Sequence, residues 1–218
     1  MCFNCMAIQE SDSPEDYARM AQESLIRAYS YKDIAKGQSV TQDSDEESDF
    51  AVKKILIVYY SWSNGNTEAV ARKLQAGLKA ELVRIETVQP YTGSYDEVVQ
   101  QGQDEVSRGY RPVIQPLPVN VEDYDVIAVG TPTWWYTMAP AVATFLEATD
   151  WHGKTVIPFM TNGGWPGHVI ADIRKACAGA NFAQPMQVKF DSTGGSQMIT
   201  SETEIESWIQ SLQNDAMQ

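Results

Sequence analysis

The chain has 218 residues and a formal net charge of −13 at pH 7, a length that suits one α/β domain with an appendage. Nucleic acid and anionic membrane surfaces would both repel so acidic a protein, which excludes them as partners. No apolar run approaches the roughly 20 residues of a membrane span, and the first ten residues lack the basic start and apolar core of a signal peptide. We therefore expect a cytoplasmic protein.

Residues 1–50 differ in composition from the rest of the chain. They hold four Lys and Arg residues against eleven Asp and Glu residues, a net charge of −7. Ser13 as a cap and Pro14 in the first turn indicate a helix start, and apolar residues at helical spacing predict an amphipathic helix over 14–31. The acidic, serine-rich stretch that follows is typical of a flexible linker. We predict an acidic N-terminal arm over 1–50 and one domain over 51–218.

The three cysteines, Cys2, Cys5 and Cys177, form no disulfide framework. Cys2 and Cys5 have CxxC spacing, which suits a redox disulfide or half of a metal site. No second pair accompanies them, however, so we favour an uninvolved chain end and predict no metal site. Cys177 lies in a helical pattern and is expected to be a small buried residue.

From Ala51 onward the predicted strands and helices alternate, which favours right-handed βαβ units around a mostly parallel sheet. The predicted strands cover 54–60, 81–86, 125–130, 155–161 and 186–190, and the predicted helices cover 66–78, 95–108, 139–147, 166–178 and 202–212. The long connection over 87–118, which contains the second of these helices and ends in prolines, is a candidate lid or dimer surface.

The first predicted strand is a continuous apolar run, as in a strand buried on both faces, and the loop after it has the chemistry of a phosphate site. The loop carries hydroxyls, amides and one glycine, namely Ser61, Ser63, Asn64, Gly65, Asn66 and Thr67. A helix start follows at once, and its unpaired N–H groups would hold a phosphate together with the hydroxyls. The alternative is a plain strand-to-helix turn whose Ser and Asn side chains merely cap the helix, which Thr67 could do unaided.

The same loop excludes two common nucleotide sites. It has no Lys and no GxxxxGK[ST] pattern, so a triphosphate site with magnesium is excluded. A dinucleotide fingerprint would need three glycines where this loop has one. A small phosphate group, met by hydroxyls and N–H groups, is what remains.

Two further loops follow the third and fourth predicted strands, and their carboxyl ends should meet the phosphate loop at one edge of the sheet. The first loop contains Pro132, Thr133, Trp134, Trp135 and Tyr136, of which the last three are aromatic residues in a row. The second loop contains Thr161, Asn162, Gly163 and Gly164. Exposed rings at such an edge favour stacking on a flat ligand, while glycines let backbone N–H groups approach a ring edge. The alternative for the two tryptophans is that one covers the sheet and the other lies under the next helix. His168, at a helix start, could donate to the ring or have a capping or surface role.

The three motifs YYSWSNGNT, GTPTWWYTMAP and TNGG together resemble the flavodoxin family, in a short-chain subgroup with a Pro-x-Trp-Trp second loop, over about residues 53–213. The resemblance implies an open, doubly wound, parallel five-stranded sheet of order 2-1-3-4-5 that binds FMN. By that resemblance Ser61, Ser63, Asn64, Asn66 and Thr67 would hold the phosphate. Residues 132–136 would line the isoalloxazine ring, and Thr161, Asn162, Gly163 and Gly164 would approach its other edge. Residues 1–50 have no counterpart in the family pattern.

Three functions follow as hypotheses. The first is an FMN-binding electron carrier that docks a redox partner protein. The second is an NAD(P)H-dependent FMN reductase that acts on quinones or similar acceptors, and the third is a non-redox interaction module that uses the acidic arm. Because a flavin carries the redox chemistry itself, we predict no catalytic residue.

Overall fold

The structure is a computed structural model that describes residues 53–216. The predicted helix over 14–31, the acidic linker and the pair Cys2 and Cys5 lie outside the described residues. No helix in the described part of the chain is long and apolar enough to cross a membrane.

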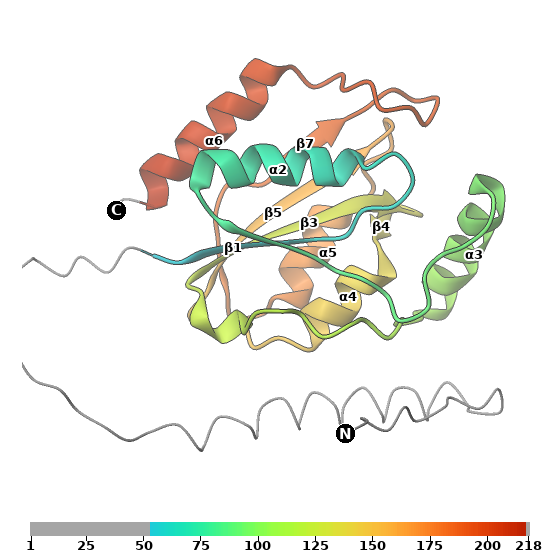
Figure 1. Ribbon diagram of the computed structural model, residues 1–218, viewed down its shortest axis with the longest axis horizontal. Coiled ribbons are helices and arrows are strands. Elements are labelled where there is room, and N and C mark those ends of the chain that lie inside the picture. The colour runs from blue at the N-terminus through green and yellow to red at the C-terminus, as the bar shows by residue number, and fades with distance from the viewer. Residues whose placement is uncertain (1–52, 217–218) are drawn as a thin grey trace, which may run out of the picture. The chain divides into compact units, whose positions relative to one another are not determined.

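One sheet runs through the centre of the domain (Figure 1). Four strands run parallel to one another, in the order β2 (Glu81–Arg84), β1 (Ile55–Tyr59), β3 (Val126–Trp134) and β5 (Thr155–Asn162). Two short strands share the fifth position, since both β6 (Asn181–Phe182) and β7 (Met186–Lys189) pair parallel with β5. The predicted strand order 2-1-3-4-5 is confirmed.

Helices cover both faces of the sheet (Figure 1). Their bounds are α2 (Asn66–Leu78), α3 (Tyr95–Arg108), the 3₁₀ turn η2 (Val121–Asp123), α4 (Pro140–Glu147), α5 (Val169–Ala176) and α6 (Glu202–Ala216). Side chains alternate along β1: Ile57 and Tyr59 pack with buried residues of α2 and α6, whereas Leu56 and Val58 pack with those of α4 and α5. This gives the two-sided core expected of an apolar parallel strand, and it leaves the carboxyl ends of the strands free for loops.

Helix α3 stands away from both faces, beside the carboxyl ends of the strands (Figure 1, green). It starts at a capping box, in which Ser94 Oγ accepts from the Glu97 N–H and Glu97 Oε2 accepts from the Ser94 N–H. It ends at Gly109, whose φ of 63° is the left-handed conformation that glycine adopts without strain. Its bounds are those predicted, and its place at this edge makes it a wall of whatever lies there.

Several predicted boundaries were wrong. Strand β3 does not stop at Gly130 but continues to Trp134 and turns back into β4 (Thr137–Met138), because threonine and tryptophan favour extended backbone. Helix α5 starts at Val169, since Gly164 and Gly167 adopt left-handed or related backbone with φ of 116° and 58°. Strand β2 ends two residues early and β6 was missed.

Candidate cofactor site

A cavity of about 520 Å³ opens at the carboxyl edge of the sheet. Its walls come from the three predicted loops, from α3 and from the loop after β7. The predicted residues that line it are Ser63, Asn64, Asn66, Thr67, Pro132, Thr133, Trp134, Trp135, Tyr136, Thr161, Asn162 and Gly163. Ser61 and Gly65 instead line a second hollow beside Glu68 and Arg84, and Gly164 lines neither hollow.

The start of α2 is open to a ligand. Its N-cap is Gly65, in left-handed backbone with φ 73°, which has no side chain with which to cap the helix. Ser61 Oγ accepts from the Glu68 N–H of the first turn at 3.4 Å. The alternative of a capped turn therefore holds for this one N–H group, whereas Thr67, whose hydroxyl bonds Thr161, does not cap the helix. An uncapped helix start beside a cavity presents N–H groups and a positive dipole end, which suit a phosphate.

Thr67 makes a different contact, with Thr161 at the end of β5. Their Oγ1 atoms lie 2.8 Å apart, and the two residues are only 1% and 4% exposed. Either hydroxyl can donate, so the one that accepts keeps its own proton free. The pair ties the start of α2 to the end of β5 and offers a ligand in the cavity one hydroxyl proton.

The two asparagines of the loop bind protein groups. Asn64 Nδ2 donates to the Gly194 carbonyl, and Asn66 Nδ2 donates to the Gly195 carbonyl at 3.0 Å. The contacts that their side-chain N–H groups make in the structure therefore tie two loops together, whereas their predicted contact with phosphate stays a prediction. Ser63, with its hydroxyl exposed and 3.5 Å from Asn64 Oδ1, is the freer donor.

Charge near the phosphate loop is balanced within the protein. Glu68, in the first turn of α2, forms ion pairs with Arg72 at 2.6 Å and with Arg84 at 3.3 Å. Arg84 also donates to the Ser61 carbonyl at 2.9 Å. No Lys or Arg among the described residues lines the main cavity. A bound anion would therefore be met by N–H groups and hydroxyls, as the sequence predicts.

The aromatic loop is a tight hairpin turn between β3 and β4. Trp135 and Tyr136 both have left-handed backbone, with φ of 48° and 67°, which costs a non-glycine residue about 1–2 kcal/mol. Two hydrogen bonds hold the turn: Trp135 Nε1 donates to the Val99 carbonyl of α3 at 2.7 Å, and the His168 N–H donates to the Tyr136 carbonyl at 2.8 Å. Strained turns of this kind persist where surrounding contacts fix them, which is common at ligand sites.

Trp134 is buried, being 8% exposed, although it also lines the cavity. Its ring lies edge-on to those of Tyr60 and Trp62, and it packs so closely on α3 that a Cβ at Gly102 would lie 2.0 Å from Nε1. The alternative in which one tryptophan covers the sheet thus holds for Trp134, whereas Trp135 is 38% exposed.

Two buried polar atoms of cavity-lining residues have no hydrogen-bond partner among the described residues, namely Thr133 Oγ1 and Trp134 Nε1. Buried hydroxyls in proteins are almost always paired. Because Thr133 lines the cavity beside exposed rings, its hydroxyl fits a flat heterocycle with hydrogen-bonding groups at its edge, as in the isoalloxazine of FMN.

The structure adds residues to the site that the sequence prediction left out. They are Trp62, Tyr95, Val98, Val99, Trp165 and the run 190–195. The rings of Trp62 and Tyr95 stack, with centroids 5.9 Å apart and an interplanar angle of 25°. Trp165 and the run after β7 could have been found, because both follow strand ends at the same edge. The α3 residues could not, since nothing local in the sequence places that helix over the cavity.

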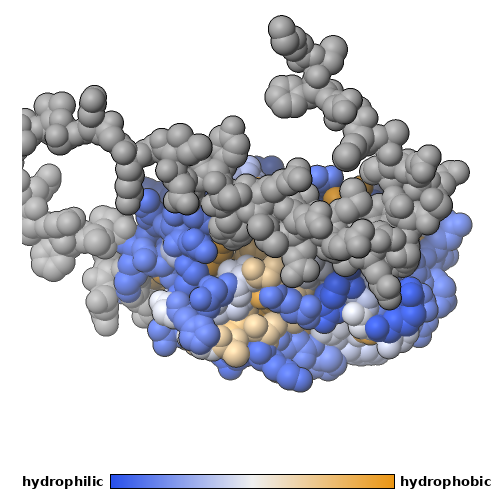
Figure 2. All heavy atoms as spheres, turned by 90° about the horizontal axis from the view of Figure 1, so that it is seen from below, coloured by the Kyte–Doolittle hydropathy of each residue, from blue (hydrophilic) through white to orange (hydrophobic). Residues whose placement is uncertain are grey.

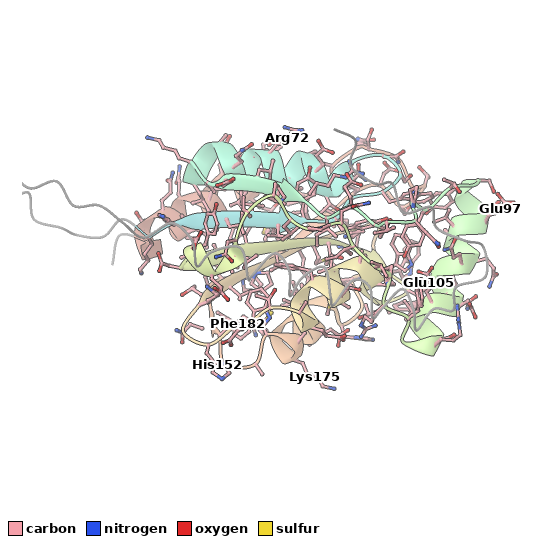
Figure 3. The ribbon with its side chains drawn as sticks, turned by 60° about the horizontal axis from the view of Figure 1, so that its bottom comes forward. Arg72, Glu97, Glu105, His152, Lys175 and Phe182 are labelled. Carbon is pink, nitrogen blue, oxygen red and sulfur yellow. The ribbon has the colours of Figure 1, made fainter. Side chains whose placement is uncertain are left out.

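Glu105 supports the wall from behind. It lies on the side of α3 that faces the sheet, whereas Glu97 lies on the outer side (Figure 3). Glu105 is only 3% exposed, and its carboxylate accepts from Tyr91 Oη at 2.7 Å and from Gln101 Nε2 at 2.7 Å. Burial raises the pKa of Tyr91, and the hydrogen bond to Glu105 raises it further, so the tyrosine stays a neutral donor. The Tyr91 ring in turn lies 5.2 Å from that of Trp134.

Exposed apolar side chains gather at the mouth of the cavity. Tyr95, Trp135, Tyr136 and Trp165 are between 38% and 59% exposed, and all four line it. The face viewed in Figure 2 is mainly hydrophilic, with a smaller apolar area between its ends. Elsewhere in the described chain the large exposed apolar residues are Val88 and Ile199. A concentration of rings at one opening marks a binding site.

Two expectations outside the cavity can be compared with the structure. Cys177 is fully buried as predicted, and burial raises the pKa of its thiol to about 12. His168 does not line the cavity; its Nδ1 pairs with Asp172 Oδ2, which also accepts from Thr137 Oγ1 at 2.5 Å. His168 is the N-cap residue of α5, but its side chain makes no capping hydrogen bond. Of the expected roles, its exposed side chain fits the surface role.

A family model and two solved structures are similar to this chain. The flavodoxin family model matches residues 54–212. A flavoprotein from Lactobacillus acidophilus, solved in complex with FMN, superposes with a TM-score of 0.57 at 23% identity, covering 72% of this chain and 98% of that one. A Bacteroides eggerthii protein assigned as a flavoprotein gives 0.60 at 29% identity, covering 73% and 97%.

One relative has a named activity. The protein called NAD(P)H dehydrogenase (quinone) 3 from Rhizobium meliloti strain 1021 is 35% identical over 105 residues. That stretch is 44% of this chain and 43% of the relative, so less than half of either protein is compared. The family match, by contrast, spans nearly all of the described residues. The chain belongs to the flavodoxin family.

Proposed function

We propose that this chain binds FMN non-covalently in the cavity at the carboxyl edge of the sheet and serves in electron transfer. The observation that carries the proposal is the unpaired, buried Thr133 Oγ1 in a wall of exposed rings, in the same cavity as an uncapped helix start. A phosphate at one end and a heterocycle at the other are the two parts of FMN. The family, and a relative in complex with FMN, support the same ligand.

Each part of the ligand has residues suited to it. The first-turn N–H groups of α2, with Ser63 and the Thr67–Thr161 pair, suit the phosphate end. Trp135, Tyr136 and Trp165 offer flat apolar walls. FMN, when bound, supplies the one- and two-electron chemistry, and the protein binds it, orients it and sets its surroundings.

The protein's charge influences how readily the cofactor is reduced. The cavity is lined by rings and by one carboxylate, that of Asp191, and by no cation among the described residues. Such surroundings disfavour a negative charge on the reduced flavin ring, so we expect a low reduction potential. Surface charges farther away act weakly, because salt screens over about 10 Å.

Titration of the purified protein with FMN, followed by flavin absorbance and tryptophan fluorescence, tests the proposal. We expect stoichiometric uptake and quenching of the tryptophans around the cavity. Thr133→Val should weaken binding, whereas Thr149→Val, which removes a hydroxyl that donates to the Phe145 carbonyl outside the cavity, should not. A protein that is colourless once free FMN has been removed would contradict the proposal.

A specific observation supports a second candidate, an NAD(P)H-dependent reductase of quinones or similar acceptors. Helix α3 walls the cavity with Tyr95, Val98 and Val99, an apolar and aromatic surface of the kind on which a flat acceptor packs. The Rhizobium relative carries the name of such an enzyme. Mixing the FMN-loaded protein anaerobically with NADPH discriminates the two: rapid bleaching of the flavin favours the reductase, and no bleaching without a partner protein favours the carrier.

A further inference from the structure

The loop after β7 is built around one carboxylate. Asp191 Oδ1 accepts from the N–H groups of Thr193 and Gly195, each at 3.1 Å, and from the Thr193 hydroxyl. Asp191 Oδ2 accepts from the Gln197 N–H at 3.2 Å. These bonds, the Thr193 hydroxyl first, lower the pKa of Asp191, so the carboxylate is ionised at neutral pH and the loop is folded around it.

Hydrogen bonds tie this loop to the phosphate loop, which is far from it in the sequence. The carbonyls of Gly194 and Gly195 accept from the side-chain amides of Asn64 and Asn66, the second at 3.0 Å. The two glycines thus stand between Asp191, which fixes their backbone, and the asparagines that flank Gly65, the N-cap of α2. A continuous set of hydrogen bonds runs from one carboxylate to the start of the helix.

The position of Asp191 is otherwise hard to explain. It is the only charged residue among the described residues that line the cavity. A carboxylate in the wall of a site for a phosphate would weaken binding through repulsion between like charges. Its oxygens, however, are occupied by donors of their own loop, which indicates that the carboxylate orders the loop.

We propose that Asp191 is a positioning residue for the phosphate of the cofactor, acting through the carbonyls of Gly194 and Gly195 on Asn64 and Asn66. It holds the phosphate loop in the conformation that presents the α2 N–H groups and Ser63 to the cavity. The inference rests on the proposed binding of FMN and assigns the two asparagines to this support rather than to direct phosphate contact.

Three variants test it. Asp191→Ala removes both side-chain oxygens that accept from the loop, and Asp191→Asn keeps Oδ1 but removes the charge. Asp150→Ala is the matched control, because Asp150 accepts in the same way from the His152 N–H at 3.1 Å and does not line the cavity. Dissociation constants are measured for FMN and for riboflavin, which has the same ring and no phosphate, and thermal unfolding is recorded for each protein.

We expect Asp191→Ala to raise the Kd for FMN about 10-fold, which corresponds to about 1.4 kcal/mol, and to change the Kd for riboflavin by no more than about twofold. Asp191→Asn should restore binding of FMN to at least the wild-type level, since it keeps three of the bonds and removes the repulsion. Asp150→Ala should change neither constant. Unchanged or tighter FMN binding by Asp191→Ala, or an equal loss for both flavins, would overturn the inference.

A double-mutant cycle separates support from direct contact. If Asn66 acts through the loop, the effects of Asn66→Ala and Asp191→Ala on FMN binding will not add, whereas those of Thr133→Val, at the ring end of the cavity, and Asp191→Ala will add. Should Asp191→Ala fail to fold, Gly195→Ala replaces it, because its Cβ would lie 2.6 Å from Asp191 Oδ2 and displace the carboxylate while keeping the charge. Additive effects for Asn66 would make it a phosphate ligand and refute the proposal.

Wild-type protein that binds neither flavin would refute the proposed function itself, whereas FMN binding without the expected differences would refute this inference alone.

Discussion

The hydroxyls of the phosphate loop look alike in the sequence but differ in the structure. Ser63 is exposed, whereas Thr67 is 1% exposed and shares a buried hydrogen bond with Thr161. The sequence could predict that these residues gather near a phosphate, because a loop between a buried strand and a helix start has few other uses for so many donors. It could not predict the pairing, since Thr161 lies 94 residues further along the chain.

This difference leads to a prediction at the level of single residues. Ser63→Ala should weaken FMN binding by about 1.5–3 kcal/mol, the typical value of a hydrogen bond to a charged group, and leave the free energy of unfolding unchanged. Thr67→Val should weaken binding and also destabilise the apoprotein by about 1–3 kcal/mol, because Thr161 is left buried without a partner. FMN titration and urea unfolding of both variants measure the two effects. Equal stability of the two apoproteins would contradict the buried pair.

Helix α3 is the element whose role changed most between sequence and structure. Its bounds were predictable from the turn residues around it, but its place beside the cavity depends on contacts far apart in sequence. Gly102 admits Trp134 against the helix, and the Val99 carbonyl accepts from Trp135. The residue bounds of a helix with a strong local pattern can thus be predicted even where its position in the fold cannot. For the same reason, the aromatic loop was recognised as part of the site but its hairpin was not.

Gly102 leaves a notch in α3 that the Trp134 indole occupies. A side chain placed in this notch should show whether the helix holds the aromatic wall. A Cβ at Gly102 would lie 2.0 Å from Trp134 Nε1, so Gly102→Ala must displace the indole and the rings packed on it. We expect a loss of about 1–3 kcal/mol from overpacking, which exceeds the gain of up to about 1 kcal/mol from alanine's helix propensity. Gln103→Ala, on the exposed side of the same helix, is the control. Unfolding followed by tryptophan fluorescence measures both, and a stabilised Gly102→Ala protein would show that the notch is not tight.

The start of α3 should also respond to pH. Hydrogen bonds from the Ser94 N–H and hydroxyl lower the pKa of Glu97 below its ordinary value of 4.5. A carboxylate with a lowered pKa stabilises the folded state above that ordinary value, and its contribution is lost as the pH falls through the lowered pKa. The Ser94 amide proton, followed by NMR, should therefore titrate with a midpoint below 4.5, and Glu97→Gln should abolish the transition. A midpoint at or above the ordinary value would contradict the capping box.

At the scale of the whole molecule, the order of the sheet was the most predictable feature. Parallel strands joined by helices on alternate faces leave few arrangements, and the apolar runs of β1, β3 and β5 mark the centre. The cavity follows from that order, because the ends of β1, β3 and β5 must meet at one edge. What the order does not determine is which additional segments close the edge, namely α3 and the loop after β7.

The boundary between the arm and the domain remains a prediction, and its test is truncation. The described residues that line the cavity all lie between Trp62 and Gly195, and the family match begins at residue 54. A chain that starts at Ala51 still contains all of β1 and loses eleven acidic residues. We expect it to bind FMN with the Kd of the full-length protein, because the cavity keeps its walls. Truncation also removes a net charge of about −7. Exposed charges farther than a Debye length from an anion change its affinity little at physiological salt.

The salt dependence of the same measurement decides what the arm does. If the arm only adds charge, the affinities of the full-length and truncated proteins for FMN will differ slightly at low salt and converge as salt is added, since exposed charges are screened. If the arm binds a basic partner, truncation will abolish that binding and leave the flavin in place. Loss of flavin binding at every salt concentration would instead place part of residues 1–50 within the cofactor domain, and the predicted boundary at residue 51 would be wrong.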